Sequence, residues 1–285
     1  MRFEKMEGCG NDYIYVDGSS EKVADKAELA RKLSDRHFGI GGDGLIFINR
    51  GQAADFEMEM YNADGSRGKM CGNGIRCVAK YVYDHKMTDK EEFTIESFGS
   101  VKLIKVFTEN GRVKSARVNM GAPILEPAQI PVAESGFCDS GSGVSRRRIE
   151  LPDGNQAELT CVSMGNPHAV VFVDDCKSLD LEKTGPGYEH HPAFPEGVNT
   201  EFIRLINDKE IEMRVWERGS GETFACGTGA CAAVTACVLN EKTGREVTVH
   251  LRGGDLLIEW NEKDGCIYMT GPARTVFKGE VDINA

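Results

Sequence analysis

The chain has 285 residues, of which 40% are hydrophobic and 28% charged, and it carries a formal net charge of −11. This length is sufficient to bury two hydrophobic cores. The negative charge argues against binding to nucleic acid or to an anionic membrane surface. No apolar run reaches the roughly 18 residues that cross a bilayer, and the start "MRFEKMEGCGNDY" has no apolar signal region, so we expect a cytoplasmic protein that binds no membrane.

The ten cysteines do not form a recognisable disulfide or metal pattern. Disulfide frameworks are typical of short secreted chains, so we expect most of these cysteines to be reduced thiols that pack as small hydrophobic residues. No Cys-x-x-Cys pair is present, and the spacing from Cys71 to Cys77 or from Cys226 to Cys231 does not favour zinc. We therefore expect no metal site.

Two helices are predicted in the first half of the chain. One covers 26–37, with Asp25 as its N-cap, and has an ordinary amphipathic pattern. The other follows Cys71, and its apolar face recurs at i, i+3, i+4 and i+7: Ile75, Val78, Ala79 and Val82. The stretch 92–107 is then typical of a strand, a glycine turn and a second strand.

The second half repeats this order. The segment 134–148, rich in glycine and serine, is expected to be an exposed loop without chemistry. The stretch "GACAAVTACVL" at 229–239 is apolar on nearly all sides, so it predicts a buried helix, and 246–260 again predicts two strands joined by a glycine turn.

A single offset of 155 residues relates the two halves. It places Cys71 and its flanking glycines on Cys226 and its glycines, and it places Gly10-Asn11 on Gly165-Asn166. The same offset superimposes two alternating strands, with the apolar residues Phe56, Met58 and Met60 on Ile211, Met213 and Val215. We infer a tandem duplication with halves at 1–120 and 121–272, and we expect the tail 273–285 to return to the first half as an edge strand.

This pattern predicts an α+β fold of two pseudo-symmetric domains, each a strand-rich, barrel-like sheet around one central helix. A cysteine directly before a helix lies near unpaired N–H groups, which favour its thiolate and can also hold a carboxylate. If Cys71 and Cys226 face each other across a cleft, one can remove the α-hydrogen of an amino acid while the other delivers a proton to the opposite face. A single such cysteine is most often only a small buried residue, and the matched pair is what favours catalysis.

Several longer motifs resemble those of the diaminopimelate epimerase family. They are "GNDYIYVD", "GIGGDGLI", "YNADGSRGKMCGNGIRC", "GNPHAVVFV", "GVNTEF" and "WERGSGETFACGTGACA", and the resemblance runs from residue 1 past residue 270. It implies the pseudo-symmetric epimerase fold and an isomerase without pyridoxal phosphate, metal or other cofactor. It also implies that the small-molecule substrate is diaminopimelate, interconverted between its LL and meso forms on the route to lysine and cell-wall peptide.

The resemblance also implies roles for individual residues. Cys71 and Cys226 resemble the catalytic acid and base, and His168 and Glu217 match positions that assist catalysis. Gly72-Asn73 and Gly227-Thr228 match the cradles for the reacting carboxylate. The other substrate-binding positions are Asn11, Gly44, Asn62, Asn166, Asn199, Glu217 and Arg218. Some family members carry Gln where this chain has Gly44, so only its backbone is expected to contribute.

Simpler interpretations exist for each of these residues. The motifs around Asn11 and Asn62 are common turn sequences, His168 could be a packed structural histidine, and Glu217-Arg218 could be a solvated pair. Two other functions stay open: a proline racemase or hydroxyproline epimerase, and a redox switch that uses Cys71 and Cys226. A homodimer through an exposed edge strand is a further expectation.

Overall fold

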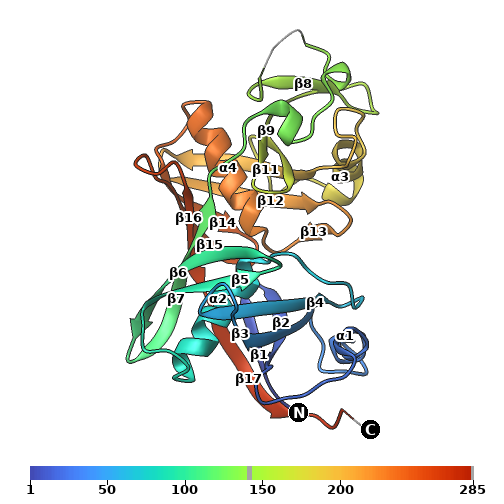
Figure 1. Cartoon of the computed structure of the whole chain (residues 1–285). Coiled ribbons are helices and arrows are strands. Elements are labelled where there is room, and N and C mark those ends of the chain that lie inside the picture. Colours follow the sequence, from blue (N-terminus) through green and yellow to red (C-terminus); the bar gives the residue numbers. More distant parts are fainter. Residues whose placement is uncertain (140–142, 284–285) are drawn as a thin grey trace. The chain divides into compact units, whose positions relative to one another are not determined.

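The computed structural model describes residues 1–139 and 143–283. The chain divides into two compact units, which we call unit 1 (Met1–Asn119 with Thr270–Ala285) and unit 2 (Met120–Met269). Both are rich in strands and contain few helices (Figure 1). The predicted α+β class is confirmed.

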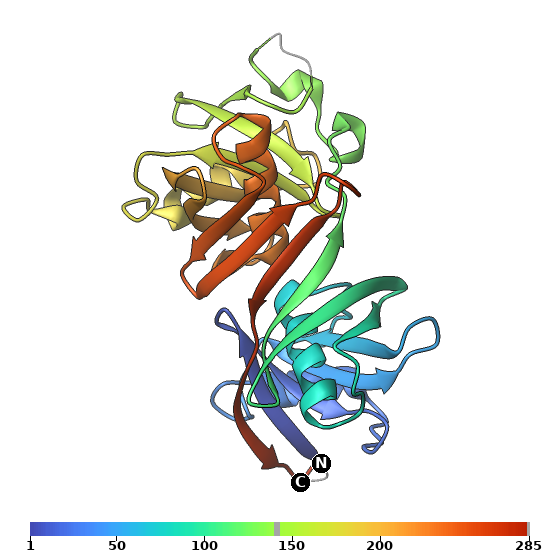
Figure 2. The same cartoon turned by 90° about the vertical axis from the view of Figure 1, so that its left-hand side faces the viewer.

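Unit 1 consists of a mixed sheet and two helices. Its elements are β1 (Arg2–Gly8), β2 (Asn11–Asp17), α1 (Lys26–Ser34), β3 (Gly44–Arg50), β4 (Phe56–Asn62), α2 (Gly72–Asp84), β5 (Glu92–Ser97), β6 (Ser100–Glu109), β7 (Arg112–Gly121) and β17 (Arg274–Glu280). Strand β17 pairs antiparallel with β1, so the C-terminal segment runs beside the N-terminal strand (Figure 2).

Unit 2 has a comparable set. Its elements are the short 3-10 helices η1 (Pro127–Gln129) and η2 (Glu134–Gly136), then β8 (Arg147–Glu150), β9 (Gln156–Ser163), β10 (Pro167–Phe172), α3 (Leu181–Glu189), β11 (Asn199–Asn207), β12 (Glu210–Glu217), β13 (Gly221–Thr223), α4 (Gly227–Leu239), β14 (Glu246–Leu251), β15 (Gly254–Trp260) and β16 (Ile267–Pro272).

The strand pairing confirms the duplication. From β1 to β6 the successive pairs are antiparallel, parallel, antiparallel, parallel and antiparallel, and the same sequence of pairings joins β9, β10, β11, β12, β14 and β15. The register is the same in the three central strands, because Leu45 opposite Tyr61 becomes Thr200 opposite Trp216, and Tyr13 beside Gly44 becomes His168 beside Asn199. The offset of 155 residues read from the sequence therefore holds from β2 to β4 and shifts by one residue in the flanking strands.

The two long helices are the apolar centres of the units. The predicted face of α2 is fully buried, and α2 packs against β1, β2, β6 and β17. Helix α4 is buried at nearly every position and packs against β9, β10, β11, β14 and β15 (Figure 1). A fully buried valine or isoleucine, such as Ile75 on α2 or Val234 on α4, contributes about 1.5–3 kcal/mol. This burial fixes both helices against the strands that they contact.

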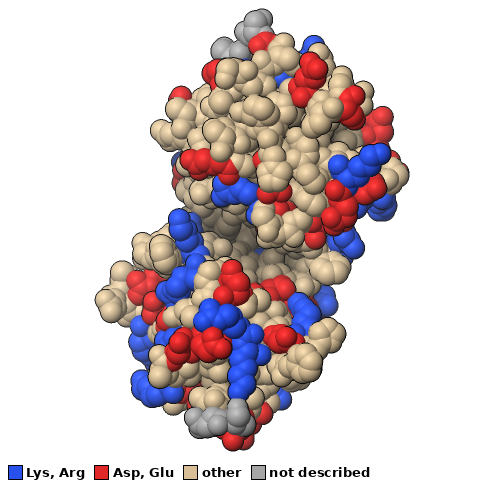
Figure 3. Space-filling view, turned by 90° about the vertical axis from the view of Figure 1, so that its right-hand side faces the viewer, with Lys and Arg blue, Asp and Glu red and all other residues tan. Residues whose placement is uncertain are grey.

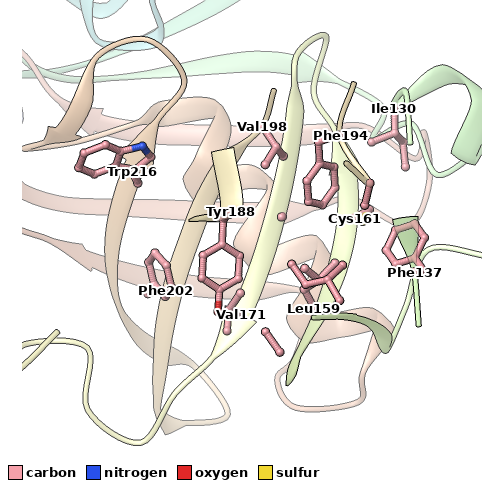
Figure 4. Packing of buried hydrophobic residues seen from close by; sticks show 14 of the residues in the cluster. Ile130, Phe137, Leu159, Cys161, Val171, Tyr188, Phe194, Val198, Phe202 and Trp216 are labelled. Carbon is pink, nitrogen blue, oxygen red and sulfur yellow. The ribbon is translucent and has the colours of Figure 1, made fainter. Parts of the chain in front are cut away.

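A second apolar cluster of unit 2 lies under β8, α3 and the segment that precedes β8 (Figure 4). Tyr188 and Phe202 meet edge to face there, with their ring centroids 5.3 Å apart. Arg147 was expected on an exposed loop, but it is buried, stacks on Phe137 and bonds to Glu134 and Asp139. Residues 140–142 of that predicted loop lie outside the described residues.

Acidic and basic side chains are interspersed over the face of the molecule in Figure 3. None of the helices within the described ranges is long and apolar enough to cross a membrane.

Candidate active site

Cys71 is the N-cap of α2 in unit 1. Its backbone is extended, and its sulfur accepts a hydrogen bond from the Gly74 N–H at 3.2 Å. The predicted cradle residues, Gly72 and Asn73, are the first two residues of the helix, where backbone N–H groups have no intrahelical acceptor. The turn therefore combines a thiol with a group of donors that suit an anion.

Asn11 connects Cys71 to a network of charged side chains. The Cys71 thiol donates to Asn11 Oδ1 at 3.2 Å, and Asn11 Nδ2 donates to Asp43 at 2.6 Å. The Asp43 carboxylate also accepts from the Asp12 N–H and from the Arg36 guanidinium. Because an ionised carboxylate only accepts, Asn11 must turn its nitrogen to Asp43 and its oxygen to the sulfur.

Charges behind Asn11 hold this arrangement. Lys5 is buried and lies 2.6 Å from Asp12, which also pairs with Arg36 at 2.8 Å. Burial opposes ionisation of Asp12, but the hydrogen bonds from Arg36 and Lys5 outweigh it and lower the pKa of Asp12. Burial raises the pKa of Asp43. Sequence reasoning missed this network, although three of its members lie inside the quoted motifs.

Gly44 and Asn62 are opposite each other on β3 and β4. A Cβ atom on Gly44 would lie 2.1 Å from the Tyr61 carbonyl oxygen, so this position has no space for a side chain. Asn62 Nδ2 donates to Ser66 Oγ at 3.0 Å within its own turn. Asn62 thus has a local partner of the kind that the simpler interpretation describes.

Cys226 is the N-cap of α4 in unit 2, in the same backbone conformation as Cys71. Its sulfur accepts from the Gly229 N–H at 3.4 Å and lies 3.5 Å from the Thr228 hydroxyl. It is 6% exposed. Burial, followed by the Glu217 and Glu201 carboxylates, raises the pKa of Cys226 well above its ordinary value. The lowered pKa that we expected from the helix terminus is therefore wrong for this cysteine, because burial and two carboxylates outweigh the helix N–H groups.

His168 lies behind this turn and is fully buried. Its Nδ1 is 2.7 Å from Glu201 Oε1, and its Nε2 is 3.0 Å from Asn166 Oδ1. Asn166 Nδ2 in turn donates to Thr228 Oγ1 at 3.4 Å. Two predicted site residues, His168 and Asn166, thus form one hydrogen-bonded group with the cradle residue Thr228, and Glu201 is a member that sequence reasoning missed.

Glu217 is the last residue of β12, and Arg218 begins the segment that follows. Asn199 fixes it, since its side chain accepts from the Arg218 N–H at 3.0 Å and donates to the Pro167 carbonyl at 2.9 Å. Glu217 contacts the Thr223 hydroxyl. The exposed Arg218 guanidinium donates to the Glu196 carbonyl at 2.8 Å and has no carboxylate partner among the described residues. This arrangement leaves a cation available to an anionic ligand.

Glu189, another residue that sequence reasoning missed, also fixes the chain around Glu217 and Arg218. Its buried carboxylate accepts from the Trp216 indole N–H at 2.7 Å and from the Gly219 N–H at 2.8 Å.

Over residues 1–139 and 143–283, no group of three or more His, Cys, Asp or Glu side chains has a geometry suited to a metal ion. All ten cysteines, which lie within these ranges, are free thiols.

Solved structures with the same fold belong to several families. A PhzF-family phenazine biosynthesis protein from Bacillus anthracis matches with a TM-score of 0.70 at 14% identity, covering 99% of both chains. A probable proline racemase from Agrobacterium radiobacter matches with a TM-score of 0.70 at 15% identity, covering 99% of this chain and 93% of the other. At such low identity the likeness supports the fold alone.

The sequence comparisons are more specific. The family model described as diaminopimelate epimerase matches residues 3–126 and 160–276. Diaminopimelate epimerases from Agathobacter rectalis and Methanococcus maripaludis are 55% and 53% identical, each covering 99% of this chain and 100% of the relative. The resemblance inferred from the motifs is confirmed: the chain belongs to the diaminopimelate epimerase family.

Proposed function

We propose that this protein interconverts LL- and meso-diaminopimelate with Cys71 and Cys226 as the two acid–base groups. As a member of its family it is an isomerase of the epimerase class. The observation that carries the mechanism is the repeated turn. Each unit places one thiol at the N-cap of its buried helix, at positions related by the offset of the duplication.

In the proposed reaction, one cysteine as thiolate takes the α-hydrogen of the substrate as a proton. The electron pair of the broken C–H bond remains on the planar carbon and its carboxylate, which the N–H groups of the two helix N-termini stabilise. The second cysteine then gives its thiol proton to the opposite face of the carbon. The configuration is inverted, the first cysteine ends as thiol and the second as thiolate.

The raised pKa of Cys226 is compatible with this scheme. A buried thiol with a high pKa is protonated at neutral pH and is ready to act as the acid. In the reverse direction its thiolate is a strong base, since the same burial and the same carboxylates favour the return of a proton.

The remaining predicted residues are proposed to hold and orient the substrate. Arg218 suits the carboxylate of the distal amino-acid group, because its guanidinium is exposed and can bind bidentately. Hydrogen bonds from the ammonium groups can be accepted by the Glu217 carboxylate and by the side-chain oxygens of the predicted asparagines, which are Asn11, Asn62, Asn166 and Asn199. His168 is proposed to assist catalysis through Asn166 rather than by touching the substrate, since both of its ring nitrogens already have partners.

Incorporation of solvent deuterium tests this function. With LL-diaminopimelate in deuterium oxide under reducing conditions, we expect deuterium at the α-carbon of the meso product and no turnover of proline. Turnover of proline alone would overturn the substrate assignment, and a protein without deuterium exchange would instead favour a redox or binding role.

We also propose a homodimer through the edge of unit 1 and a cytoplasmic location. Two consecutive large apolar residues of β17, Val276 and Phe277, are 57% and 46% exposed and are accessible to a partner. Sedimentation of the wild-type chain should give a dimer that Val276→Lys converts to monomers, and a wild-type monomer would contradict the proposal.

The proposed cytoplasmic location is supported by the ten free thiols, which suit a reducing compartment, and cell fractionation can test it.

A further inference from the structure

Glu201 is a fully buried carboxylate to which the scheme above gives no role. It lies on β11 and is 0% exposed. Its Oε1 meets His168 Nδ1 at 2.7 Å, while its Oε2 has no hydrogen-bond partner among the described residues. A buried carboxylate with a single partner destabilises a fold, so its presence calls for an explanation other than stability.

The duplication provides an internal control. The offset that relates the halves pairs Glu201 with Ile46, and both side chains lie behind the first turn of their helix. A Cβ atom on Gly229 would lie 2.5 Å from Glu201 Oε1, and a Cβ atom on the matching Gly74 would lie 3.1 Å from Ile46 Cδ1. Because unit 1 forms this turn with an isoleucine, packing does not require the carboxylate in unit 2.

A chain of hydrogen bonds connects Glu201 to the sulfur of Cys226. The chain runs from Glu201 to His168 at 2.7 Å and from His168 to Asn166 at 3.0 Å. It continues from Asn166 to Thr228 at 3.4 Å and from Thr228 to the sulfur at 3.5 Å. Asn166 Oδ1 can only accept, so the hydrogen in its contact with His168 belongs to Nε2. Either Thr228 or Cys226 can donate in the contact between them, but a thiolate only accepts, so the Thr228 hydrogen points at the sulfur once Cys226 has lost its proton.

This direction depends on which nitrogen of His168 carries a hydrogen. Because Asn166 Oδ1 requires a hydrogen on Nε2, the 2.7 Å contact between His168 Nδ1 and Glu201 Oε1 needs one further proton, held either as imidazolium and carboxylate or as neutral imidazole and carboxylic acid. Both forms keep a hydrogen on Nε2, and both have the same net charge. Without Glu201 a neutral His168 could carry its hydrogen on either nitrogen, and the direction of the chain would no longer be fixed.

We propose that Glu201 is a positioning residue that keeps the hydrogen of His168 on Nε2 and thereby directs the Thr228 hydroxyl at the Cys226 sulfur. The Thr228 hydroxyl then stabilises the thiolate that remains after Cys226 has given its proton to the substrate carbon. The inference rests on the proposed catalytic role of Cys226.

Two variants that both remove the charge separate the hydrogen-bond chain from electrostatics. In Glu201→Gln, the amide can donate to His168 Nδ1, so Nε2 keeps its hydrogen and the chain survives. In Glu201→Ile, which installs the residue of unit 1, the chain loses its origin. We expect Glu201→Ile to lower kcat about 10- to 100-fold with little change in KM, and Glu201→Gln to retain most of the wild-type kcat.

Two readouts do not require turnover. In ¹⁵N NMR spectra of the histidine side chains, His168 should keep a protonated Nε2 in the wild type and in Glu201→Gln and lose it in part in Glu201→Ile. Glu189→Gln, which changes the other buried glutamate of unit 2, should leave these signals unchanged. In a Cys71→Ala background, alkylation of the peptide that contains Cys226, followed by mass spectrometry, should titrate at lower pH in Glu201→Gln than in Glu201→Ile.

Identical kcat values, alkylation profiles and histidine signals for Glu201→Gln and Glu201→Ile would overturn the proposal, because Glu201 would then act through its charge or volume alone. A failure of the two-cysteine scheme is distinguishable from this result. It would appear in the wild-type chain as missing deuterium exchange, whereas the histidine and alkylation measurements would still report on the chain of hydrogen bonds.

Discussion

The two cysteine turns have the same backbone and different surroundings. In both, the sulfur caps a buried helix and accepts from the N–H three residues later, at 3.2 Å in unit 1 and 3.4 Å in unit 2. Cys71 is partly exposed and donates to Asn11, whose direction Asp43 sets. Cys226 is buried and faces the Thr228 hydroxyl, at the end of a chain that begins at Glu201.

This difference teaches how a duplicated fold can serve a reaction whose two sides are not equivalent. The helix terminus and its glycine were kept, so both units place unpaired backbone N–H groups beside a thiol. The residues behind the turn diverged. Asn11 and Asn166 occupy matching positions in the two halves. Asn11 presents its oxygen toward Cys71, whereas Asn166 presents its nitrogen toward Thr228.

The largest expected effect comes from removing either sulfur. Cys71→Ala or Cys226→Ala should reduce epimerisation by ~10²- to 10⁴-fold, the range for loss of a general acid or base. Steady-state kinetics in both directions measures this, and circular dichroism verifies the fold. Should either variant lose less than about tenfold, the two units would not contribute one essential thiol each.

Arg218→Ala should chiefly weaken substrate binding. Loss of a charged hydrogen bond of about 1.5–3 kcal/mol corresponds to a KM roughly 10- to 100-fold higher. Arg218→Lys is the matched control, since it keeps the charge and loses the bidentate geometry. Its KM should lie between those of the wild type and Arg218→Ala. An unchanged KM in Arg218→Ala would place the distal carboxylate elsewhere.

Asp43→Asn tests the direction of Asn11. The substituted amide no longer requires the Asn11 nitrogen to face it, so Asn11 can turn its nitrogen toward Cys71. We expect kcat/KM to fall about tenfold, equivalent to roughly 1.4 kcal/mol. Asp55→Asn, which changes an aspartate that bonds to Thr94 in the same unit, is the control. Equal activities of the two variants would show that unit 1 does not depend on this orientation.

The smallest expected effect is a change in how the unfolding free energy depends on alkaline pH, tested at one buried cysteine on each of the two long helices. Burial raises the pKa of Cys77 on α2 and of Cys237 on α4 to about 12, whereas an unfolded cysteine ionises near pH ~8.5. The folded chain then holds protons that the unfolded chain has lost. The stabilisation from each thiol is thus complete below pH ~8.5 and lost as the pH rises toward about 12.

Denaturant unfolding over this pH range measures the effect. Cys77→Ala and Cys237→Ala should each make the fall in unfolding free energy shallower by about 1.4 kcal/mol per pH unit. Cys266→Ala removes a half-buried thiol and is the matched control. A slope that responds to only one of the two variants would show that the helices differ in how well they exclude water.

Much of the fold could be predicted from the sequence, because the duplication offset is a pattern of spacing, and the register of the three central strands follows it. The predicted cap at Asp25 and the strand pairs at 92–107 and 246–260 are confirmed, although the first helix ends earlier, at Ser34. These features depend on neighbouring residues, which the sequence displays directly.

The rest of the site depends on contacts between distant residues. The raised pKa of Cys226 arises first from burial and then from Glu217 and Glu201, which precede it by 9 and 25 positions, and none of these is visible to a rule about helix termini. Arg147 was expected in solvent because its neighbours are polar, yet Phe137 and Asp139 bury it. Roles of the predicted site residues remain predictions for the experiments above.

The pairing of β17 with β1 has a consequence for synthesis of the chain. Unit 2 is continuous in sequence and can fold as soon as residue 269 has left the ribosome. Unit 1 waits for Arg274–Glu280, because only then does its first strand receive its last neighbour and Phe3 its ring contact with Phe277. The half that is translated first is therefore the half that matures last, with its opening strand in need of protection throughout elongation.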